Sequence, residues 1–284
     1  MSHFVVPSTI VLEVKGRDAI RYLNARLTND IKNLPIGDTC LAAALTPQGK
    51  TEGLFSVTKL SDERAILVCD GGDRNQVISA FKRYLVADRV EVSDISSETT
   101  LLHFIGEIRL SSYQYIIKNP RKRSIEEGAD ILLGHDSYKI IKADLKKDSF
   151  WDDQEVKLQR MRAGIPSFPE EINEQRLFVE AAFFDAISQT KGCYVGQEVV
   201  ERVLSHGKPP KVLRLIEFST KKEISSGQTV CLPNGDAIGT VLSSVLDPEN
   251  KVVYAFASIK NDPSFFAEPV STNEIAGKFI VPMK

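Results

Sequence analysis

Lys191-Gly192-Cys193-Tyr194-Val195-Gly196-Gln197-Glu198-Val199-Val200-Glu201 is the most informative stretch of the chain, because it puts a cysteine between two glycines and beside a cation. A lysine two positions from a thiol favours the thiolate, which is the reactive and metal-binding form. Glycine lets the backbone adopt conformations, or approach a ligand, in ways that other residues hinder. The stretch is therefore typical of a functional site and not of a packed core.

The same run resembles the signature of the YgfZ-type folate-binding proteins, relatives of the aminomethyltransferase (T-protein) of the glycine cleavage system. In that family a lysine, glycine, cysteine, aromatic residue, any residue, glycine, glutamine and glutamate occur in this order, and every fixed position matches here. The resemblance implies an α+β fold with a T-protein-like arrangement. In that arrangement two α/β sandwich subdomains surround a central folate cavity, and a C-terminal antiparallel β-barrel follows.

Other parts of the chain are similar to further elements of this family. Glu180-Ala181 lies eleven residues before Lys191, as the family's Glu-Ala pair does. Arg162 stands where the family's Arg-Leu-Glu-Ala-Gly-Ile-Pro has an acidic residue. The remaining similar segments are Gly16-Arg17-Asp18-Ala19, Leu27-Thr28-Asn29-Asp30 and Arg160-Met161-Arg162-Ala163-Gly164-Ile165-Pro166.

Glu180 is the first candidate for binding tetrahydrofolate, or a derivative, in the pocket that the resemblance implies. The pterin edge presents an amino group beside a ring N–H, and a carboxylate accepts both hydrogen bonds in a bidentate, charge-assisted pair. The alternative is that Glu180 is an exposed helix residue, and Glu171 is then the fallback. Tyr194, Gln197 and Glu198 belong to the matched signature and are expected at the same cofactor site.

Arg160 and Arg202 are candidates for the negatively charged glutamate tail of folate, because both lie next to matched family elements. A guanidinium near the pocket mouth would hold that tail. Either arginine could instead pair with a nearby acid such as Glu198 or Glu201. The sequence leaves both interpretations open.

Asn29 and Asp30 also have two possible roles. Asn and Asp side chains often bond nearby backbone groups in turns, which gives both residues a structural role at the end of the first helix. The alternative is that Asp30 faces the folate cavity. The sequence does not separate these roles.

Cys193, with Lys191, is the candidate functional thiol. A nucleophilic cysteine usually needs a base within hydrogen-bond reach, and no histidine lies close in sequence; His206 could approach only through folding. We therefore favour a reactive thiol for cluster, thiol or carrier chemistry over a Cys/His hydrolase. The competing interpretation is a buried Cys193 that only packs the folate pocket.

The composition is that of an ordinary globular protein of 284 residues, with 42% hydrophobic and 26% charged side chains. With 36 basic and 38 acidic side chains the net charge is −2, so no general nucleic-acid attraction is expected, although a local basic patch remains open. The stretch from Phe4 to Val14 is a better strand than a signal peptide. No run approaches the roughly 20 apolar residues that span a bilayer. We expect a soluble, cytoplasmic protein.

The four cysteines are widely separated and form no CxxC pair, and the histidines do not supply close ligand spacing either. We therefore expect reduced thiols and no metal site. Cys40 and Cys69 lie in apolar runs, where a free cysteine is usually a small buried hydrophobe.

Hydrophobic patterning and turn signals predict alternating strands and helices up to about residue 205. Helices are expected over Asp18–Leu27, from Gly71 to about Leu85, and over about Asp152–Arg162. Strands are expected at Val11–Val14, Cys40–Leu45, Gly53–Lys59, Arg64–Cys69, Arg89–Val92, Leu101–Ile105, Tyr113–Ile117, Ile131–Leu133 and Tyr138–Ile141.

A turn or linker at Ser205–Pro210 separates two predicted regions. Residues 1–205 form the folate-binding α+β region, with its two subdomains divided near 95–110. Residues 210–284 form a small antiparallel barrel, because short β-like runs recur between turn signals. These runs are Val212–Phe218, Gln228–Leu232, Ala237–Val245 and Val252–Ile259.

One departure from the resembling aminomethyltransferases bears on function. Those enzymes carry an acidic pair after the early glycine hairpin, whereas this chain has only Glu52, followed by Gly53. The glycine cleavage reaction is therefore not expected. The resemblance implies a folate-binding accessory protein that supports assembly or repair of iron–sulfur clusters, with client or assembly proteins as partners. The alternatives are a folate-dependent one-carbon transferase acting on a small amine, and an interaction scaffold with an empty pocket.

Overall fold

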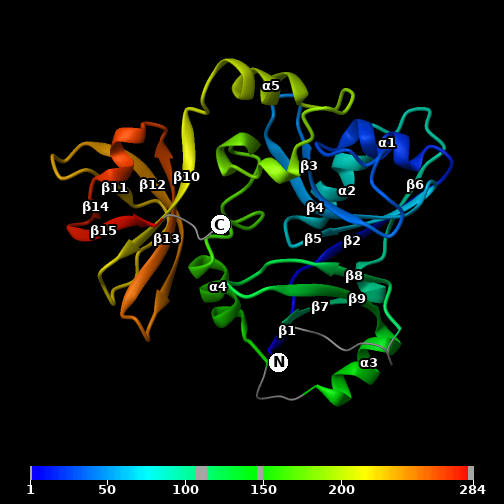
Figure 1. Ribbon diagram of the computed structural model, residues 1–284, viewed down its shortest axis with the longest axis horizontal. Coiled ribbons are helices and arrows are strands. Elements are labelled where there is room, and N and C mark those ends of the chain that lie inside the picture. The colour runs from blue at the N-terminus through cyan, green and yellow to red at the C-terminus, as the bar shows by residue number, and fades with distance from the viewer. Residues whose placement is uncertain (1, 107–113, 146–149, 281–284) are drawn as a thin grey trace.

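Two stacked β-sheets and a β-barrel form the framework of the protein in the computed structural model, which describes residues 2–106, 114–145 and 150–280 (Figure 1). The first sheet has the order β3-β4-β5-β2-β6 and is antiparallel throughout. Its strands are β2 (Ile10–Lys15), β3 (Thr39–Leu45), β4 (Thr51–Ser61), β5 (Arg64–Cys69) and β6 (Glu91–Asp94).

Both faces of the first sheet are covered, which explains why its central strands are almost continuously apolar. Leu12 and Leu67 point to the side of α1 (Ala19–Arg26) and α2 (Arg74–Lys82) and share one core with Leu23 and Phe81. Their neighbours in sequence point the other way, toward the second sheet: Val11, Ile66 and Val68 pack with Phe4, Leu101, Ile117 and Leu132.

The second sheet has the order β1-β7-β9-β8. Its strands are β1 (His3–Val5), β7 (Thr99–Ile105), β8 (Ile117–Pro120) and β9 (Gly128–Gly134), and the short helix η1 (Ser96–Glu98) precedes β7. The first strand of the chain thus belongs to the second sheet, where Phe4 pairs with His103. The predicted strand at Tyr113 begins outside the described residues, and β8 starts only at Ile117.

The predicted strand at Tyr138–Ile141 is wrong, because these residues lie in the helix α3 (His135–Asp144). Tyr138, Ile141 and Leu145 form one apolar stripe at helical spacing, and they pack on the outer face of the second sheet. Gly134 is the N-cap, and Asp136 lies in the first turn, where the helix dipole favours a negative charge.

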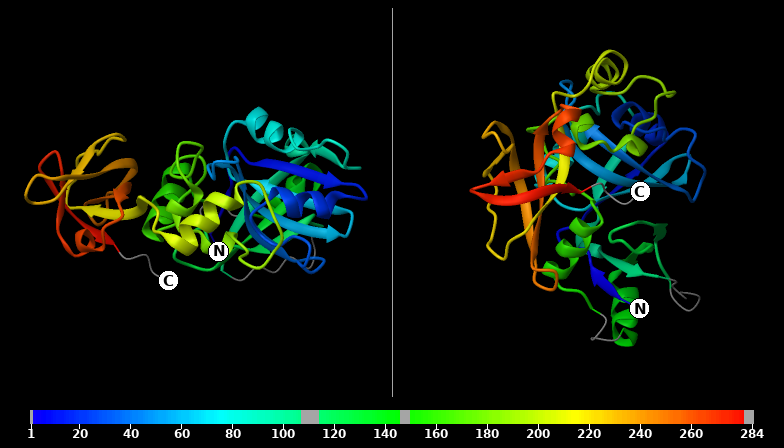
Figure 2. Two further views of the ribbon diagram at one scale, coloured as in Figure 1. Left: turned by 90° about the horizontal axis from the view of Figure 1, so that it is seen from above. Right: turned by 60° about the vertical axis from the view of Figure 1, so that its left-hand side comes forward.

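A long connection, residues 150–206, lies between the sheets and the barrel (Figures 1 and 2). It contains α4 (Asp153–Arg162), the short helices η3 (Phe178–Ala181) and η4 (Phe184–Ala186), and α5 (Gln197–His206), a helix that sequence patterning did not predict. The Asp152 side chain caps α4 by accepting a hydrogen bond from the Glu155 N–H at 2.8 Å.

The C-terminal part is a closed six-stranded barrel with the order β10-β13-β12-β11-β14-β15. Its elements are β10 (Lys211–Phe218), β11 (Thr229–Cys231), β12 (Ala237–Asp247), β13 (Val252–Lys260), η5 (Pro263–Ala267), β14 (Val270–Thr272) and β15 (Ile275–Ile280). Arg162 of α4 donates to the buried Asp247 at 2.6 and 2.9 Å. Arg162 therefore links α4 to the barrel.

Among the described residues, no helix combines the length and the apolar character needed to cross a bilayer.

Candidate functional site

A cavity of about 380 Å³ lies where the two sheets meet the connection between sheets and barrel. Its volume falls within the range of small-molecule pockets, about 300–1,000 Å³. The lining combines apolar side chains with a few polar groups: Thr39, Cys40, Leu41, Leu54, Ser56, Asp70, Asn119, Pro120, Arg121, Lys122, Ile165, Pro166, Ser167, Phe168, Phe183 and Asp185. We call this space the central cavity.

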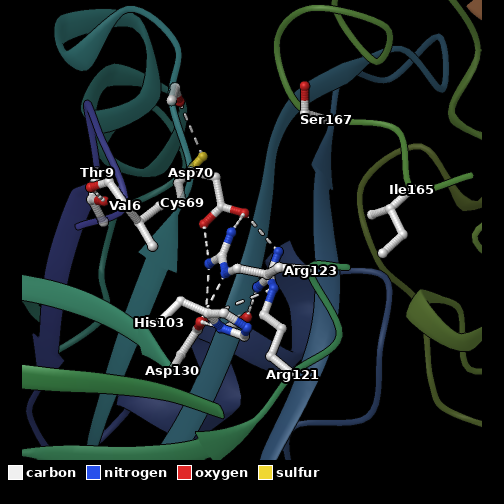
Figure 3. A network of polar contacts seen from close by, with 12 residues as sticks. Val6, Thr9, Cys69, Asp70, His103, Arg121, Arg123, Asp130, Ile165 and Ser167 are labelled. Atoms are coloured by element: carbon white, nitrogen blue, oxygen red, sulfur yellow. Dashed lines mark hydrogen bonds and ion pairs between the residues drawn. The ribbon is translucent and has the colours of Figure 1, made fainter. Parts of the chain in front are cut away.

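A network of partly buried and buried charges lies at one wall of the central cavity (Figure 3). Asp70, just after β5, accepts from Arg121 at 2.7 Å and from Arg123 at 2.8 Å through two donors. Arg123 also grips Asp130 of β9 through two hydrogen bonds of 2.7 Å. The network therefore joins the first sheet to the second at the cavity wall.

The charge states within the network follow from these contacts. Burial would raise the pKa of both Asp70 and Asp130, but the neighbouring guanidiniums outweigh burial and hold each pKa below its usual value. His103 of β7 lies 2.8 Å from Asp130 through Nδ1, yet burial lowers its pKa. His103 is therefore neutral at pH 7, and its buried Nε2 has no partner among the described residues.

Lys191, beside Cys193 in sequence, is bound by backbone carbonyl groups. Its ammonium donates to the carbonyl oxygens of Asn24, Leu27 and Asn29, the last two at 2.6 and 2.7 Å. Burial lowers the pKa of Lys191 to about 8. The lysine therefore anchors the signature segment to the C-terminal end of α1.

Cys193 is exposed at the surface, whereas Cys69 is buried and Cys40 is partly buried. Burial raises the pKa of the Cys40 thiol to about 11 and that of Cys69 to about 12. Because Cys193 is exposed, it is not buried like Cys69, as the competing interpretation expected. The side chain of His206, the histidine considered as a partner, lies outside the described set.

Gly196 sets the geometry where the signature enters α5. It has a φ of +85°, and an added Cβ would lie 2.6 Å from the Thr46 carbonyl oxygen. Gln197 accepts from the Tyr194 N–H at 3.3 Å, while Glu198 is exposed. Tyr194 is buried, which raises its pKa to about 12, and its hydroxyl has no partner among the described residues.

Asn29 joins two parts of the cavity lining. Its amide donates to the carbonyl oxygens of Leu41, at 2.8 Å, and Asp185, at 2.9 Å. The Asp30 carboxylate instead accepts from the Asn33 backbone and side chain at 3.0 and 2.7 Å. Both side chains therefore bond nearby or facing backbone groups, and Asn29 links two segments that line the cavity.

Glu180 lies apart from the lining of the central cavity. It borders a small void beside the barrel, together with Arg176 and Leu213, and burial raises its pKa. Glu171, the fallback, is buried and accepts from Arg160 at 2.9 Å and from the Ser167 N–H at 2.6 Å.

The two arginines proposed for the folate tail also lie in different settings. Arg160 is paired with Glu170 and Glu171, each at 2.9 Å, whereas Arg202 is exposed on α5. The sequence analysis did not identify the charged residues that line the central cavity, which are Asp70, Arg121, Lys122 and Asp185. The cluster Arg121-Lys122-Arg123 was visible in the sequence, but a short charge run is usually a solvated surface.

Both carboxylate oxygens of Glu52 accept hydrogen bonds from arginines. One oxygen accepts from the buried Arg26, and the other accepts from Arg83 at 3.0 Å. Within the described residues no cluster of three or more His, Cys, Asp and Glu side chains could hold a metal ion.

Comparisons with known proteins agree with this architecture. The GCVT N-terminal domain matches residues 6–107. A Haemophilus influenzae protein named "Uncharacterized protein" is 29% identical over 254 residues, which cover 86% of this chain and 85% of that protein. The tRNA-modifying protein YgfZ of Aliivibrio fischeri is 23% identical over 263 residues, covering 87% of this chain and 81% of its own length.

The structural comparison concerns the fold alone. The glycine cleavage system aminomethyltransferase T from Bartonella henselae matches with a TM-score of 0.85 at 17% identity, over 99% of this chain and 85% of that one. The T-protein-like fold and the resemblance to the YgfZ type, both predicted from the sequence, are confirmed.

Proposed function

On the premise that the chain is a YgfZ-type, aminomethyltransferase-like protein, we propose that it binds tetrahydrofolate or a derivative in the central cavity and supports assembly or repair of iron–sulfur clusters in client enzymes. The observation that carries the folate part is the lining of the cavity. Leu41, Leu54 and Phe168 offer apolar surface to a flat ring, and the same lining includes polar side chains that could bind the polar edge of that ring.

Asp185 is the carboxylate best suited to the pterin edge. It lines the cavity, its backbone is fixed by Asn29, and its side chain has no ion-pair partner in the described parts of the chain. Asp70, the other carboxylate of the lining, is already occupied by Arg121 and Arg123. The family resemblance predicts Glu180 for the same role. Mutating Asp185 and Glu180 one at a time shows which of these two acids binds the folate.

Calorimetric titration with tetrahydrofolate tests the folate part. Asp185→Asn keeps the size of the side chain but loses the charged acceptor, so affinity should fall roughly ten- to hundredfold, the equivalent of about 1.5–3 kcal/mol. Glu180→Gln should change affinity less than threefold, like the control Asp136→Asn on the exposed surface of α3. The reverse pattern would return the assignment to Glu180, and absence of binding by the unmodified protein would refute the proposal.

An accessory role is favoured over one-carbon transfer by two features. Glu52, which stands where the aminomethyltransferases resembling this chain have an acidic pair, is bound by Arg26 and Arg83. Cys193 is exposed, where another protein can reach it. Turnover separates the two roles: a transferase consumes methylene-tetrahydrofolate in the presence of an amine donor, whereas an accessory protein binds folate without consuming it.

The name of the Aliivibrio fischeri relative directs the search for clients toward enzymes that modify tRNA. Cells lacking this chain should lose activity of iron–sulfur enzymes of that kind. The unmodified chain should restore activity, and Cys193→Ser should not. Full restoration by Cys193→Ser would remove the thiol from the proposal, and normal activity without the chain would refute the accessory role.

A further inference from the structure

A second chamber of about 210 Å³ adjoins the central cavity. The two spaces share Asp70, Arg121, Lys122 and the segment 165–168 as lining. The second chamber then extends between the end of β1 and α4, past Val6 and Val156. A ligand too long for the central cavity therefore has a continuation on the far side of this shared wall.

The charges of the second chamber differ from those of the central cavity. Five cations line it, and four of them are paired with carboxylates: Arg121 and Arg123 with Asp70, and Lys157 and Arg160 with Glu170. Two further acids outside this lining pair with the same arginines: Asp130 with Arg123, and Glu171 with Arg160.

Lys122 is the exception. It is partly buried, it lines both chambers, and no carboxylate pairs with it within the described ranges. Asp153, the remaining acid of the chamber, is exposed in the first turn of α4, where the positive end of the helix dipole already faces it. The shared wall therefore offers one unneutralised ammonium to an anion.

The second chamber also has an apolar part, formed by Phe4, Val6, Val156, Ile165 and Phe168. A ligand that fits both parts carries a flat apolar ring and a carboxylate near it. The aminobenzoyl-glutamate half of a folate has these two groups, attached to the pterin.

We propose that the second chamber binds the aminobenzoyl-glutamate half of the folate and that Lys122 holds its carboxylate. This inference rests on the proposed folate binding and adds a residue and a subsite to it. It also replaces Arg160 and Arg202 as tail residues, because Arg160 is already neutralised and Arg202 lies outside both linings.

Two ligands and three variants test the subsite by calorimetry. The primary carboxamide of tetrahydropteroate has the ring system of tetrahydrofolate but carries no carboxylate. The unmodified protein should bind tetrahydrofolate at least about tenfold more tightly than this carboxamide, as one charge-assisted hydrogen bond provides. Lys122→Gln should lose most of this preference by weakening only tetrahydrofolate. Lys122→Arg should retain it, and so should Lys118→Gln, a control at an exposed lysine of β8.

Each other outcome counts against the subsite in its own way. Equal affinity of the unmodified protein for the two ligands would overturn it while leaving folate binding intact. An equal loss of both ligands in Lys122→Gln would show that Lys122 acts on the ring or on folding, which unfolding curves would confirm. Failure of the unmodified protein to bind either ligand would overturn the proposed function and the subsite together.

Discussion

Replacing Arg123 by glutamine should destabilise the protein more than any exposed arginine substitution, because Arg123 bridges two carboxylates with four hydrogen bonds of 2.7–2.8 Å. Its side chain is only 12% exposed, and Asp130 is 5% exposed. Removing one partner from a buried ion pair leaves an uncompensated charge and costs about 3–5 kcal/mol. Arg121 still contacts Asp70, so we expect a loss near 3 kcal/mol.

Urea unfolding at pH 7 measures this loss, with Arg21→Gln as the control, since Arg21 pairs with Asp88 at the surface and is 69% exposed. Exposed pairs contribute about 0–1 kcal/mol. The direction in which the stability contribution of Asp130 changes with pH follows from its pKa. The depressed pKa of Asp130 means that its contribution is present above pH about 4 and is lost as the pH falls further.

The difference between the unmodified protein and Arg123→Gln should therefore shrink below pH 4, where protonation removes the unpaired charges from the variant. Equal stability of Arg123→Gln and Arg21→Gln at pH 7 would refute the reasoning. A difference that grows on acidification would refute the assigned charge states.

Cys193 should be alkylated much faster than Cys69, and faster than Cys40, in the native protein, because it is exposed and Cys69 is buried; peptide mapping after timed alkylation measures this, and equal rates would withdraw the thiol chemistry. Lys191 titrates near pH 8 when folded but near 10.4 when unfolded, so between these values stability should rise with pH by up to about 1.4 kcal/mol per unit relative to Lys191→Met, measured by urea unfolding at pH 7, 8.5 and 10. An unchanged slope in the variant would contradict that pKa. Limited proteolysis with a protease of broad specificity should cut first within 205–210, where Gly207 and Lys208 are exposed, if this stretch is the domain boundary; first cleavage elsewhere would move the boundary.

Much of the fold followed from local pattern. Strands such as β5 and β13 coincide with apolar runs between turns, and the N-cap of α4 was visible as Asp152. Sequence patterning failed for elements whose secondary structure depends on tertiary contacts. The stripe of α3 has only one buried side chain, Ile141, and the glycine that opens α5 has a φ that no periodicity reveals.

The site was less predictable, because its lining comes from segments far apart in the chain. The signature identified the family, but its lysine bonds carbonyl groups near residues 24–29 and not the neighbouring thiol. Asp70 and Arg123 meet only after the two sheets stack. No single segment carries both partners, so their pairing could not be derived from spacing.

The core beneath α1 and α2 has a consequence for biosynthesis. It includes Phe178, Val179, Tyr194 and Val200, which enter from the long connection. A growing chain that has reached the end of β5 thus lacks part of its own core until more than a hundred further residues are made. At about 5–20 residues per second the wait is on the order of ten seconds. During that interval the nascent first sheet offers apolar surface to chaperones, and a truncated chain ending before residue 178 would expose it permanently.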